Sequence, residues 1–292
     1  MRTLGDEAMI KRICVIGAGT MGAGIAQTAA EGGIETVIRD VDEKALKRGL
    51  ATVKNFIGKK LEKGRISQEE HDAILGRVEG ATELEIALNG VDLVIEAVFE
   101  DVKLKMDVFR QIDAICPEGV ILASNTSTLS ISRIASVTAN PRRVIGTHFF
   151  SPVPVMRLVE VIRGKDTSEN VVAAVLDFCR KIGKTPILAG DVPGFIVNRF
   201  LCLLYNEAAN EIYHGLASAE DIDTGLKLGA NHPMGPVEIM DMAGVDVVYL
   251  ALSSLYEMTG EERYKPSPIF GQMITENRLG RKTGRGFYDY GK

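Results

Sequence analysis

The stretch Ile13-Cys-Val-Ile-Gly17-Ala-Gly19-Thr-Met-Gly22-Ala-Gly24 decides the fold of the first part of this chain. Its apolar start predicts a β-strand, and Gly-x-Gly-x-x-Gly directly after it predicts a tight turn that runs into a helix. In such a unit Gly17 permits the turn, Gly19 removes a side chain where the backbone meets a pyrophosphate, and Gly22 lets the helix pack close to the strand. The helix N-terminus then faces the anion. The stretch therefore predicts a dinucleotide-binding unit.

An acidic residue ends the next predicted strand, Glu35–Arg39. Asp40 lies 18 positions after Gly22, where such units place an acid that binds the adenosine ribose hydroxyls. Its charge would repel a 2′-phosphate, which favours NAD over NADP, although the neighbouring Arg39 works against that exclusion. The alternative is that Asp40 only caps the following helix, but Asp42 is at least as well placed for that role.

Outward from this motif, the first two-thirds of the chain alternates β-rich runs with helical patterns. The predicted strands are Ile13–Ile16, Glu35–Arg39, Leu93–Ala97, Val120–Ala123 and Val144–His148. This rhythm predicts an α/β fold, a Rossmann-type and mostly parallel sheet with helices on both faces. The long charged stretch at residues 43–76 predicts two inserted helices, separated at Lys63-Gly64-Arg65.

The strand signal fades after about residue 190. Asp191-Val-Pro-Gly marks a boundary, because Pro193 suits a helix start and Asp191 is placed to cap that helix. The expected helices beyond it are Phe195–His214, Ala219–Leu228 and Val245–Tyr256. At 292 residues two domains are expected, a Rossmann-type domain at residues 1–190 and an all-α C-terminal domain at residues 191–292.

The composition argues against several classes of protein. The balance of 34 basic and 39 acidic residues gives a net charge of −5, whereas nucleic-acid-binding proteins carry a basic excess. Cys14, Cys116, Cys179 and Cys202 form no Cys-x-x-Cys pair, so reduced and buried thiols are expected rather than disulfides or a metal site. Residues 1–9 do not resemble a secretory signal, and no apolar run approaches the ~18 residues of a spanning helix. A cytoplasmic protein without nucleic-acid or membrane partners is expected.

Two apolar strands, Val144–Phe150 and Arg157–Ile162, flank a turn with a proline at its centre, Pro154. His148 and Glu160 are equally far from Pro154, so a hairpin centred there makes them face each other. Facing side chains lie ~5 Å apart at Cβ, close enough for the carboxylate to bond the imidazole and fix its tautomer. Proton transfer to or from an alcohol requires such a group. A buried pair that only joins the two strands is the alternative, but the place of the pair just beyond a dinucleotide fold favours catalysis.

Five stretches carry a resemblance to a known family. They are Val91-Asp-Leu-Val-Ile-Glu-Ala-Val-Phe-Glu100, Ser124-Asn-Thr-Ser-Thr128, His148-Phe-Phe-Ser-Pro-Val-Pro-Val-Met-Arg-Leu-Val-Glu-Val, Asp191-Val-Pro-Gly-Phe-Ile-Val-Asn-Arg and Gly284-Arg-Gly-Phe-Tyr. In order and spacing, from about residue 10 onward, the chain resembles the 3-hydroxyacyl-CoA dehydrogenases, most closely the 3-hydroxybutyryl-CoA dehydrogenases of bacterial type. The resemblance implies reversible hydride transfer between NAD and C3 of a short L-3-hydroxyacyl-CoA, by a homodimer whose helical domain serves substrate binding and dimerisation.

The resemblance also implies roles for individual residues. His148 would be the general acid and base, Glu160 its partner, and Asn198 and Ser127 would contact the substrate oxygens near the reacting carbon. The residues implied to bind the cofactor are Gly17, Gly19, Thr20, Met21, Gly22, Asp40, Glu100, Lys105, Asn125, Ser127 and Ser151.

Each implied role has a structural alternative. Ser127 and Asn198 are also ordinary residues at helix starts, and Glu100 with Lys105 can form a plain surface pair. Ser151 departs from the family, which usually has asparagine after His-Phe-Phe. Its shorter side chain would replace a direct contact to the cofactor with one through water, which weakens cofactor affinity without changing the reaction.

The inserted helices contain a basic run that can meet the phosphates of coenzyme A as point charges, although a solvated helix face explains most of it. Lys60 is the exception, because it aligns with a lysine that binds coenzyme A in the animal members of the family. A serine that accompanies that lysine falls near Val53, so half of this phosphate site is missing. The basic residues are Lys54, Lys59, Lys60, Lys63 and Arg65.

Two rival functions remain open on the sequence. Dehydrogenases of free β-hydroxyacids share the organisation; the hydroxyisobutyrate type uses a lysine where this chain has His148, whereas the gulonate type keeps the histidine and glutamate. Only substrate tests separate the latter. A non-catalytic dinucleotide-binding relative would have lost one of His148, Glu160 or Asn198, and all three are present.

Overall fold

The computed structural model describes residues 10–291, so the expectation about a signal in residues 1–9 lies outside the described part. The chain divides into two compact units, the first ending at Phe195 and the second beginning at Ile196. The predicted boundary after residue 190 falls just before this division.

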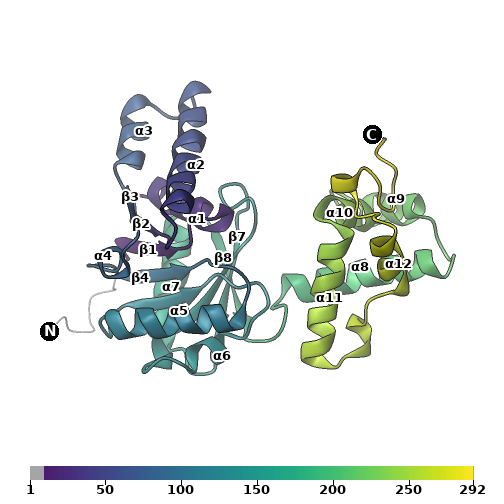
Figure 1. Ribbon diagram of the computed structural model, residues 1–292. Helices are drawn as coiled ribbons and strands as arrows, with labels where there is room; N and C mark the ends of the chain where they lie inside the picture. Colours follow the sequence, from purple (N-terminus) through teal and green to yellow (C-terminus); the bar gives the residue numbers. More distant parts are fainter. Residues whose placement is uncertain (1–9, 292) are drawn as a thin grey trace. The chain divides into compact units, whose positions relative to one another are not determined.

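An eight-stranded sheet forms the first unit, with strand order β3-β2-β1-β4-β5-β6-β7-β8 (Figure 1). All neighbouring strands are parallel except β6 and β7, so the predicted Rossmann-type, mostly parallel sheet is confirmed. The strands are β1 Arg12–Ile16, β2 Glu35–Arg39, β3 Val78–Ala81, β4 Leu93–Glu96, β5 Ile121–Ser124, β6 Val144–Phe149, β7 Leu158–Arg163 and β8 Thr185–Gly190.

Burial explains which strands the sequence reveals. Every residue of β4, β5 and β6 is buried, so these strands appear as apolar runs of the kind typical of parallel sheets covered on both faces. The strands β3 and β8, which were not predicted, lie at the two ends of the sheet and are largely exposed. Their mixed sequences lack the apolar run on which prediction depends.

Helices cover both faces of the sheet. One core cluster joins α1 and α7 to alternate strand residues such as Val15 and Ile95, while Phe109 of α5 and Ile134 of α6 are buried outside that cluster. The helices are α1 Thr20–Glu31, α2 Glu43–Glu62, α3 Gln68–Leu75, α4 Leu84–Ala87, α5 Val102–Ile115, α6 Ile131–Ala135 and α7 Glu169–Lys181, with a 3₁₀ turn at Pro141–Arg143.

The two predicted inserted helices are α2 and α3, which Figure 1 shows side by side next to β2 and β3. The break between them falls at residues 63–67, as the lysine-glycine-arginine run predicted. Ser67 starts α3 with a capping box, in which its hydroxyl accepts from the amide of Glu70 and the Glu70 carboxylate accepts from the amide of Ser67.

The second unit is helical, as predicted. Its helices are α8 Val197–Tyr213, α9 Ala219–Gly229, α10 Pro236–Ala243, α11 Val245–Thr259 and α12 Pro268–Thr275, with 3₁₀ turns at Glu262–Tyr264 and Arg281–Thr283. They pack around buried side chains that include Met240, Leu252 and Phe270. In residues 10–291 no single helix is long and apolar enough to cross a membrane; α10 and α11 meet the length and composition only together, across a bend of 100°.

Two buried aspartates of the second unit hold the C-terminal segment. Asp241 accepts from the amides of Phe287 and Tyr288 (both 2.9 Å), and the hydroxyl of Tyr288 donates to Asp223 (2.7 Å). Burial, followed by this bond to Asp223, raises the pKa of Tyr288 well above its usual range. The stretch Gly284-Arg-Gly-Phe-Tyr, which contributed to the family resemblance, therefore folds back onto α9 and α10.

The four cysteines are free and buried, as expected. Burial raises the pKa of Cys14 and Cys179 to about 12 and that of Cys116 and Cys202 to about 11. Such thiols stay protonated at neutral pH and are poor nucleophiles.

One prediction about the boundary is wrong. Asp191 does not cap a helix that starts at Pro193; the helix starts at Val197, and the residue in the N-cap position is Ile196. The Asp191 carboxylate instead accepts from the amides of Ile131 (2.8 Å) and Ser132 (2.7 Å), in the first turn of α6. A tertiary contact across the unit has replaced the local cap that the sequence suggested.

Candidate active site

The residues predicted to bind the cofactor gather at the carboxyl ends of the parallel strands. Gly17 follows β1, Asp40 follows β2 and Asn125 follows β5. The strands β2 and β3 lie on one side of β1, and β4 to β8 lie on the other. The strand order therefore switches direction between β1 and β4. Open α/β sheets bind their ligands in the crevice at such a switch point.

The glycine turn has the close contacts that its sequence predicts. Gly17 has φ of +105°, and a Cβ there would lie 2.7 Å from the carbonyl oxygen of Ala97. A Cβ on Gly22 would lie 1.8 Å from the carbonyl oxygen of Gly17, so α1 can pack this closely only with glycine. A Cβ on Gly19 would meet nothing within 4 Å, and no side chain caps α1. The turn therefore leaves open space in front of a helix N-terminus, which fits a pyrophosphate.

Asp40, which was predicted to bind the ribose, is held in place by two backbone amides. Its carboxylate accepts from the amides of Ala18 (2.8 Å) and Asp42 (3.0 Å), which joins the glycine turn to the end of β2. The helix-cap alternative belongs to Asp42, whose side chain accepts from the amide of Lys44 at the start of α2. The guanidinium of Arg39 donates to the carbonyl of Thr82 (3.1 Å), the residue directly after β3.

A hollow of about 620 Å³ lies next to Asp40. Its walls come from α2, α4 and the turns at the ends of β2 and β3, and they include Val41, Leu46 and Ala81. This hollow continues the cofactor side of the sheet beyond the ribose acid, where the base of a dinucleotide would extend.

A buried ion pair lies beneath the end of β4. The Nζ of Lys105 is 2.7 Å from a carboxylate oxygen of Glu96, and both side chains are 0% exposed. The Glu96 carboxylate also accepts from the hydroxyl of Ser124 (2.6 Å) and the amide of Val98 (2.7 Å). Lys105 is therefore no surface residue, and its ammonium lies between buried or partly buried carboxylates.

The second carboxylate near Lys105 is Glu100, at 3.4 Å. Glu100 Oε1 accepts from the hydroxyl of Thr126 (2.6 Å) and the amides of Ser127 (2.8 Å) and Thr128 (3.2 Å). Burial acts to raise the pKa of Glu100, but the charge of Lys105 and these hydrogen bonds outweigh it, so the pKa lies below its ordinary value. The carboxylate thus holds the loop that carries Ser127, and the surface-pair alternative for Glu100 and Lys105 does not apply.

His148 and Glu160 meet as the hairpin predicted. The antiparallel register of β6 and β7 places them directly opposite each other, and Nδ1 of His148 lies 2.7 Å from Oε2 of Glu160. The glutamate side chain is 0% exposed and the histidine side chain 9% exposed. The imidazole packs against the rings of Phe150 (4.4 Å between centroids) and Phe195 (5.9 Å). A carboxylate in this place fixes the histidine tautomer and leaves Nε2 as the nitrogen for proton transfer.

The turn of this hairpin is fixed to the rest of the unit. Lys184, directly before β8, is buried and donates to the carbonyls of Val153 and Met156 (2.8 Å to the latter). Burial lowers the pKa of Lys184. A Cβ on Gly24 of α1 would lie 2.9 Å from Val153, so the turn also packs against the cofactor helix. These contacts set where His148 stands relative to the glycine turn.

The remaining predicted residues are placed as follows. Asn125 accepts from the amide of Phe149 (2.9 Å), and Ser151 is exposed in the hairpin turn. Lys60 on α2 forms an ion pair with Glu31 (2.6 Å) while 34% of its side chain stays exposed, and Val53 is buried in the core. Asn198, Thr20 and Met21 lie in first helical turns, the former in α8 and the other two in α1.

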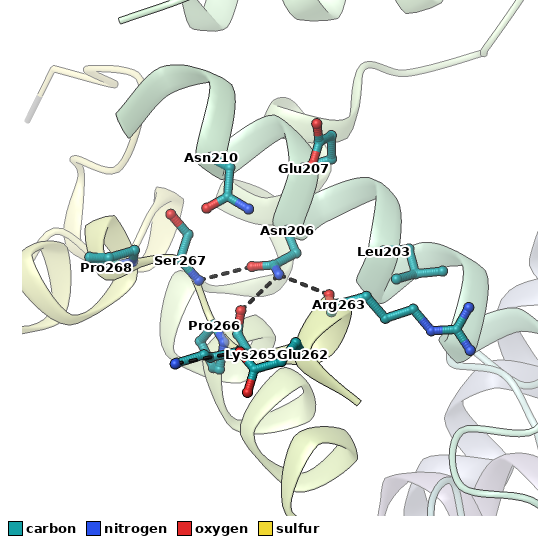
Figure 2. A pocket seen from close by; sticks show the side chains of 10 residues that line it. All are labelled: Leu203, Asn206, Glu207, Asn210, Glu262, Arg263, Lys265, Pro266, Ser267 and Pro268. Atoms are coloured by element: carbon teal, nitrogen blue, oxygen red, sulfur yellow. Dashed lines mark hydrogen bonds and ion pairs between the residues drawn. The ribbon is translucent and has the colours of Figure 1, made fainter. Parts of the chain in front are cut away.

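The second unit has a hollow of its own, of about 520 Å³ (Figure 2). The side chain of Asn206 lies at its floor, where it donates to the carbonyls of Arg263 (3.2 Å) and Lys265 (2.9 Å) and accepts from the amide of Ser267 (2.9 Å). None of the predicted site residues lines this hollow, so it is not counted with the candidate active site. Among residues 10–291 no group of three or more His, Cys, Asp or Glu side chains is arranged to hold a metal ion.

Three residues that support the site were not predicted to do so: Glu96, Lys184 and Asp191. Each bonds at least one partner that lies between 28 and 61 positions away in the sequence. A charged residue inside or beside an apolar strand is the only signal that the sequence offers for them, and Glu96 in Leu93-Val-Ile-Glu96 is the clearest case.

The family follows from comparison with known proteins. Residues 12–192 match the profile of the 3-hydroxyacyl-CoA dehydrogenase NAD-binding domain, and residues 194–290 match that of the 3-hydroxyacyl-CoA dehydrogenase C-terminal domain. The chain belongs to the 3-hydroxyacyl-CoA dehydrogenase family. It is thus an NAD-dependent oxidoreductase, and the resemblance noted from the sequence is confirmed.

Individual relatives are similar over almost their whole length. A probable 3-hydroxybutyryl-CoA dehydrogenase of Bacillus subtilis is 45% identical over 281 residues, which cover 96% of this chain and 98% of the relative. The 3-hydroxybutyryl-CoA dehydrogenase of Clostridioides difficile is 44% identical, with 96% and 100% covered. The crystal structure of (S)-3-hydroxybutyryl-CoA dehydrogenase from Ralstonia eutropha superposes with a TM-score of 0.93 at 44% identity, with 97% and 100% covered.

Proposed function

We propose that this member of the family oxidises short L-3-hydroxyacyl-CoA thioesters, of the 3-hydroxybutyryl-CoA type, and reduces the corresponding 3-ketoacyl-CoA in reverse. The observation that carries the proposal is the 2.7 Å bond between His148 and the buried Glu160, at the edge of the sheet where the dinucleotide residues gather. The relatives of similar length, named for 3-hydroxybutyryl-CoA, support the substrate class.

In the oxidation, Nε2 of His148 removes the proton from the 3-hydroxyl of the substrate. Glu160 stabilises the imidazolium that forms, because its carboxylate stays bonded to Nδ1 and is shielded from water. In the reduction the imidazolium returns the proton to the oxygen on C3. Ser127 and Asn198 orient the substrate oxygens, so that C3 presents its hydrogen to the cofactor.

The first unit holds the cofactor through the glycine turn and through Asp40, which binds the adenosine ribose. Thr20 and Met21 contribute the first amides of α1, and Asn125 and Ser151 lie on the nicotinamide side with Glu100 and Lys105. When bound, NAD supplies the hydride acceptor, and the protein supplies orientation and proton transfer.

The coenzyme A part of the substrate carries phosphates at its nucleotide end, for which Lys60 is the proposed partner on α2. Its ion pair with Glu31 would have to exchange for the phosphate, and the exposed third of its side chain makes that exchange accessible. The proposal extends to a cytoplasmic homodimer in which residues 191–292 supply substrate contacts and the subunit interface, and in which nucleic acid and membranes are not partners.

The decisive experiment follows the oxidation of NADH at 340 nm with acetoacetyl-CoA as substrate. Longer 3-ketoacyl-CoAs, free acetoacetate and NADPH are compared under the same conditions. We expect the highest kcat/KM with acetoacetyl-CoA and NADH. A higher kcat/KM with the free acid would favour the dehydrogenases of free β-hydroxyacids, and no turnover with any substrate would favour a non-catalytic relative.

A further inference from the structure

Asp191 joins two stretches that lie about 60 positions apart in the sequence. Its Oδ1 accepts from the amide of Ile131 (2.8 Å), and its Oδ2 accepts from the amide of Ser132 (2.7 Å) and the hydroxyl of Ser130 (2.9 Å). Both carboxylate oxygens are therefore used, and every donor belongs to the start of α6.

The start of α6 controls the loop that carries Ser127. Residues 125–129 run from the end of β5 to this helix, and Glu100 holds the loop at the amides of Ser127 and Thr128. Residues 127–129 are only partly buried and Ser130 is exposed, so apolar packing does little to set their path. The hydrogen bonds of Glu100 on one side and Asp191 on the other set it instead.

Asp191 also begins the stretch that leaves the first unit. That stretch ends at Phe195, whose ring is 2% exposed and packs against the imidazole of His148 at 5.9 Å. Phe195 has φ of +49°, in the left-handed region that a non-glycine residue occupies only where its surroundings hold it. The anchor at Asp191 thus lies between the Ser127 loop and a ring that covers the catalytic histidine.

We infer that Asp191 is a positioning residue of the active site, which holds the Ser127 loop in register with the segment that covers His148. The inference deepens the proposed function and rests on it, because the contact of Ser127 with substrate belongs to that proposal. An asparagine cannot do the same, since in either orientation its NH₂ group would face a backbone N–H, that of Ile131 or that of Ser132, instead of accepting from it.

The test compares D191N with the wild-type enzyme in the acetoacetyl-CoA assay. Misplacement of a substrate contact by about 1 Å costs roughly 10²-fold in rate, so we expect kcat/KM to fall by about 10- to 100-fold. In an S127A background the same change should have less than about a third of that effect, because the residue through which it acts is already gone.

The matched control is D92N. The Asp92 carboxylate also accepts from two backbone amides, those of Lys11 (2.8 Å) and Arg12 (3.1 Å), but just before β4, at the opposite edge of the sheet. Both bonds go to Oδ2, so the amide oxygen of an asparagine can keep them, and we expect D92N to leave kcat/KM within about twofold of wild type.

The outcomes separate clearly. A D191N enzyme with wild-type kcat/KM, or an effect that multiplies fully with that of S127A, would overturn the inference. If D191N does not fold, S130A removes one donor to Asp191, together with the N-cap bond to the amide of Arg133, and leaves both backbone bonds. A smaller loss that is again non-additive with S127A supports the inference, and no loss overturns it. A wild-type enzyme inactive on acetoacetyl-CoA would instead sink the proposed function, before any variant is compared.

Discussion

Replacing Lys105 with methionine removes the ammonium from the buried pair beneath the cofactor edge. The carboxylate of Glu96 would keep only the hydroxyl of Ser124 and the amide of Val98, in a place that is 0% exposed. Removal of one partner of a buried ion pair typically costs about 3–5 kcal/mol. We expect K105M to lower the free energy of unfolding of the first unit by about that amount.

The change at the other partner should cost less. In E96Q the amide oxygen can take the place of Oε1, which accepts from both Lys105 and Val98, and the NH₂ group then faces the hydroxyl of Ser124. The ammonium of Lys105 also keeps Glu100 at 3.4 Å, so we expect a cost below the ~3–5 kcal/mol of K105M. The double variant E96Q/K105M contains neither buried charge, so its loss should be smaller than the sum of the two, by about 1–3 kcal/mol.

Urea unfolding followed by circular dichroism measures these differences, since the sequence contains no tryptophan to report by fluorescence. Added NADH identifies the transition of the first unit, because only the unit that binds it is stabilised. The exposed Lys103 on the same helix provides a control of equal charge, for which K103M should stay within about 0.5 kcal/mol of wild type. A K105M loss below about 1 kcal/mol, or additive losses in the double variant, would refute the account of this pair.

Four further predictions concern the chemistry. H148A should lower kcat by about 10²–10⁴-fold while the Kd for NADH, from a fluorescence titration, stays close to wild type; full turnover would end the catalytic assignment. E160Q should retain the fold and lose activity, with a changed pH profile of kcat, and an unaltered profile would count against the pair. D40S should lose about 10- to 100-fold in kcat/KM with NADH and much less with NADPH, so an unchanged ratio of the two would contradict the ribose role. The pKa of Glu100 is lowered from its ordinary 4.5, so the ionised carboxylate stabilises the folded protein above that pH, and this stabilisation is lost as the pH falls through the lower folded pKa. Urea midpoints measured between about pH 3 and 6 should show the loss of stability. K105M should move this loss to higher pH, because the ammonium that lowers the pKa is gone.

The first half of the sheet was predictable because its signals are local. A glycine turn between an apolar strand and a helix, and an acid after the next strand, lie within a short stretch from Ile13 to Asp40. The strands β3 and β8 were not predicted, since an edge strand is apolar on too few positions to stand out. The helices α10 and α12 each begin with a proline that suits a first turn, but each has only 8 residues, too few to show a clear helical period.

The supporting groups of the site could not be predicted, because parallel strands bring together residues whose separation follows no local rule. Glu96 meets Ser124 only because β4 and β5 are neighbours, and the partners of Asp191 depend on where α6 begins. In both cases the arrangement of the elements in the fold determines the partner, and the sequence does not reveal that arrangement. Asp191 is an example. The sequence predicted that it caps the next helix along the chain, whereas its carboxylate bonds the start of α6.

The His148–Glu160 pair escaped this difficulty because β6 and β7 form the antiparallel pair of the sheet. A hairpin makes facing residues symmetric about its turn, so the turn alone predicts the pair; a parallel crossover would have left the glutamate unplaced. The same geometry explains why the pair serves the cofactor site. A strand that enters the sheet from the edge where the parallel strands end must run antiparallel to them. Residues on either side of the turn between β6 and β7, such as His148 and Glu160, therefore both lie near that edge. A shift in register by one residue would turn Glu160 to the opposite face of the sheet and leave His148 without its acid.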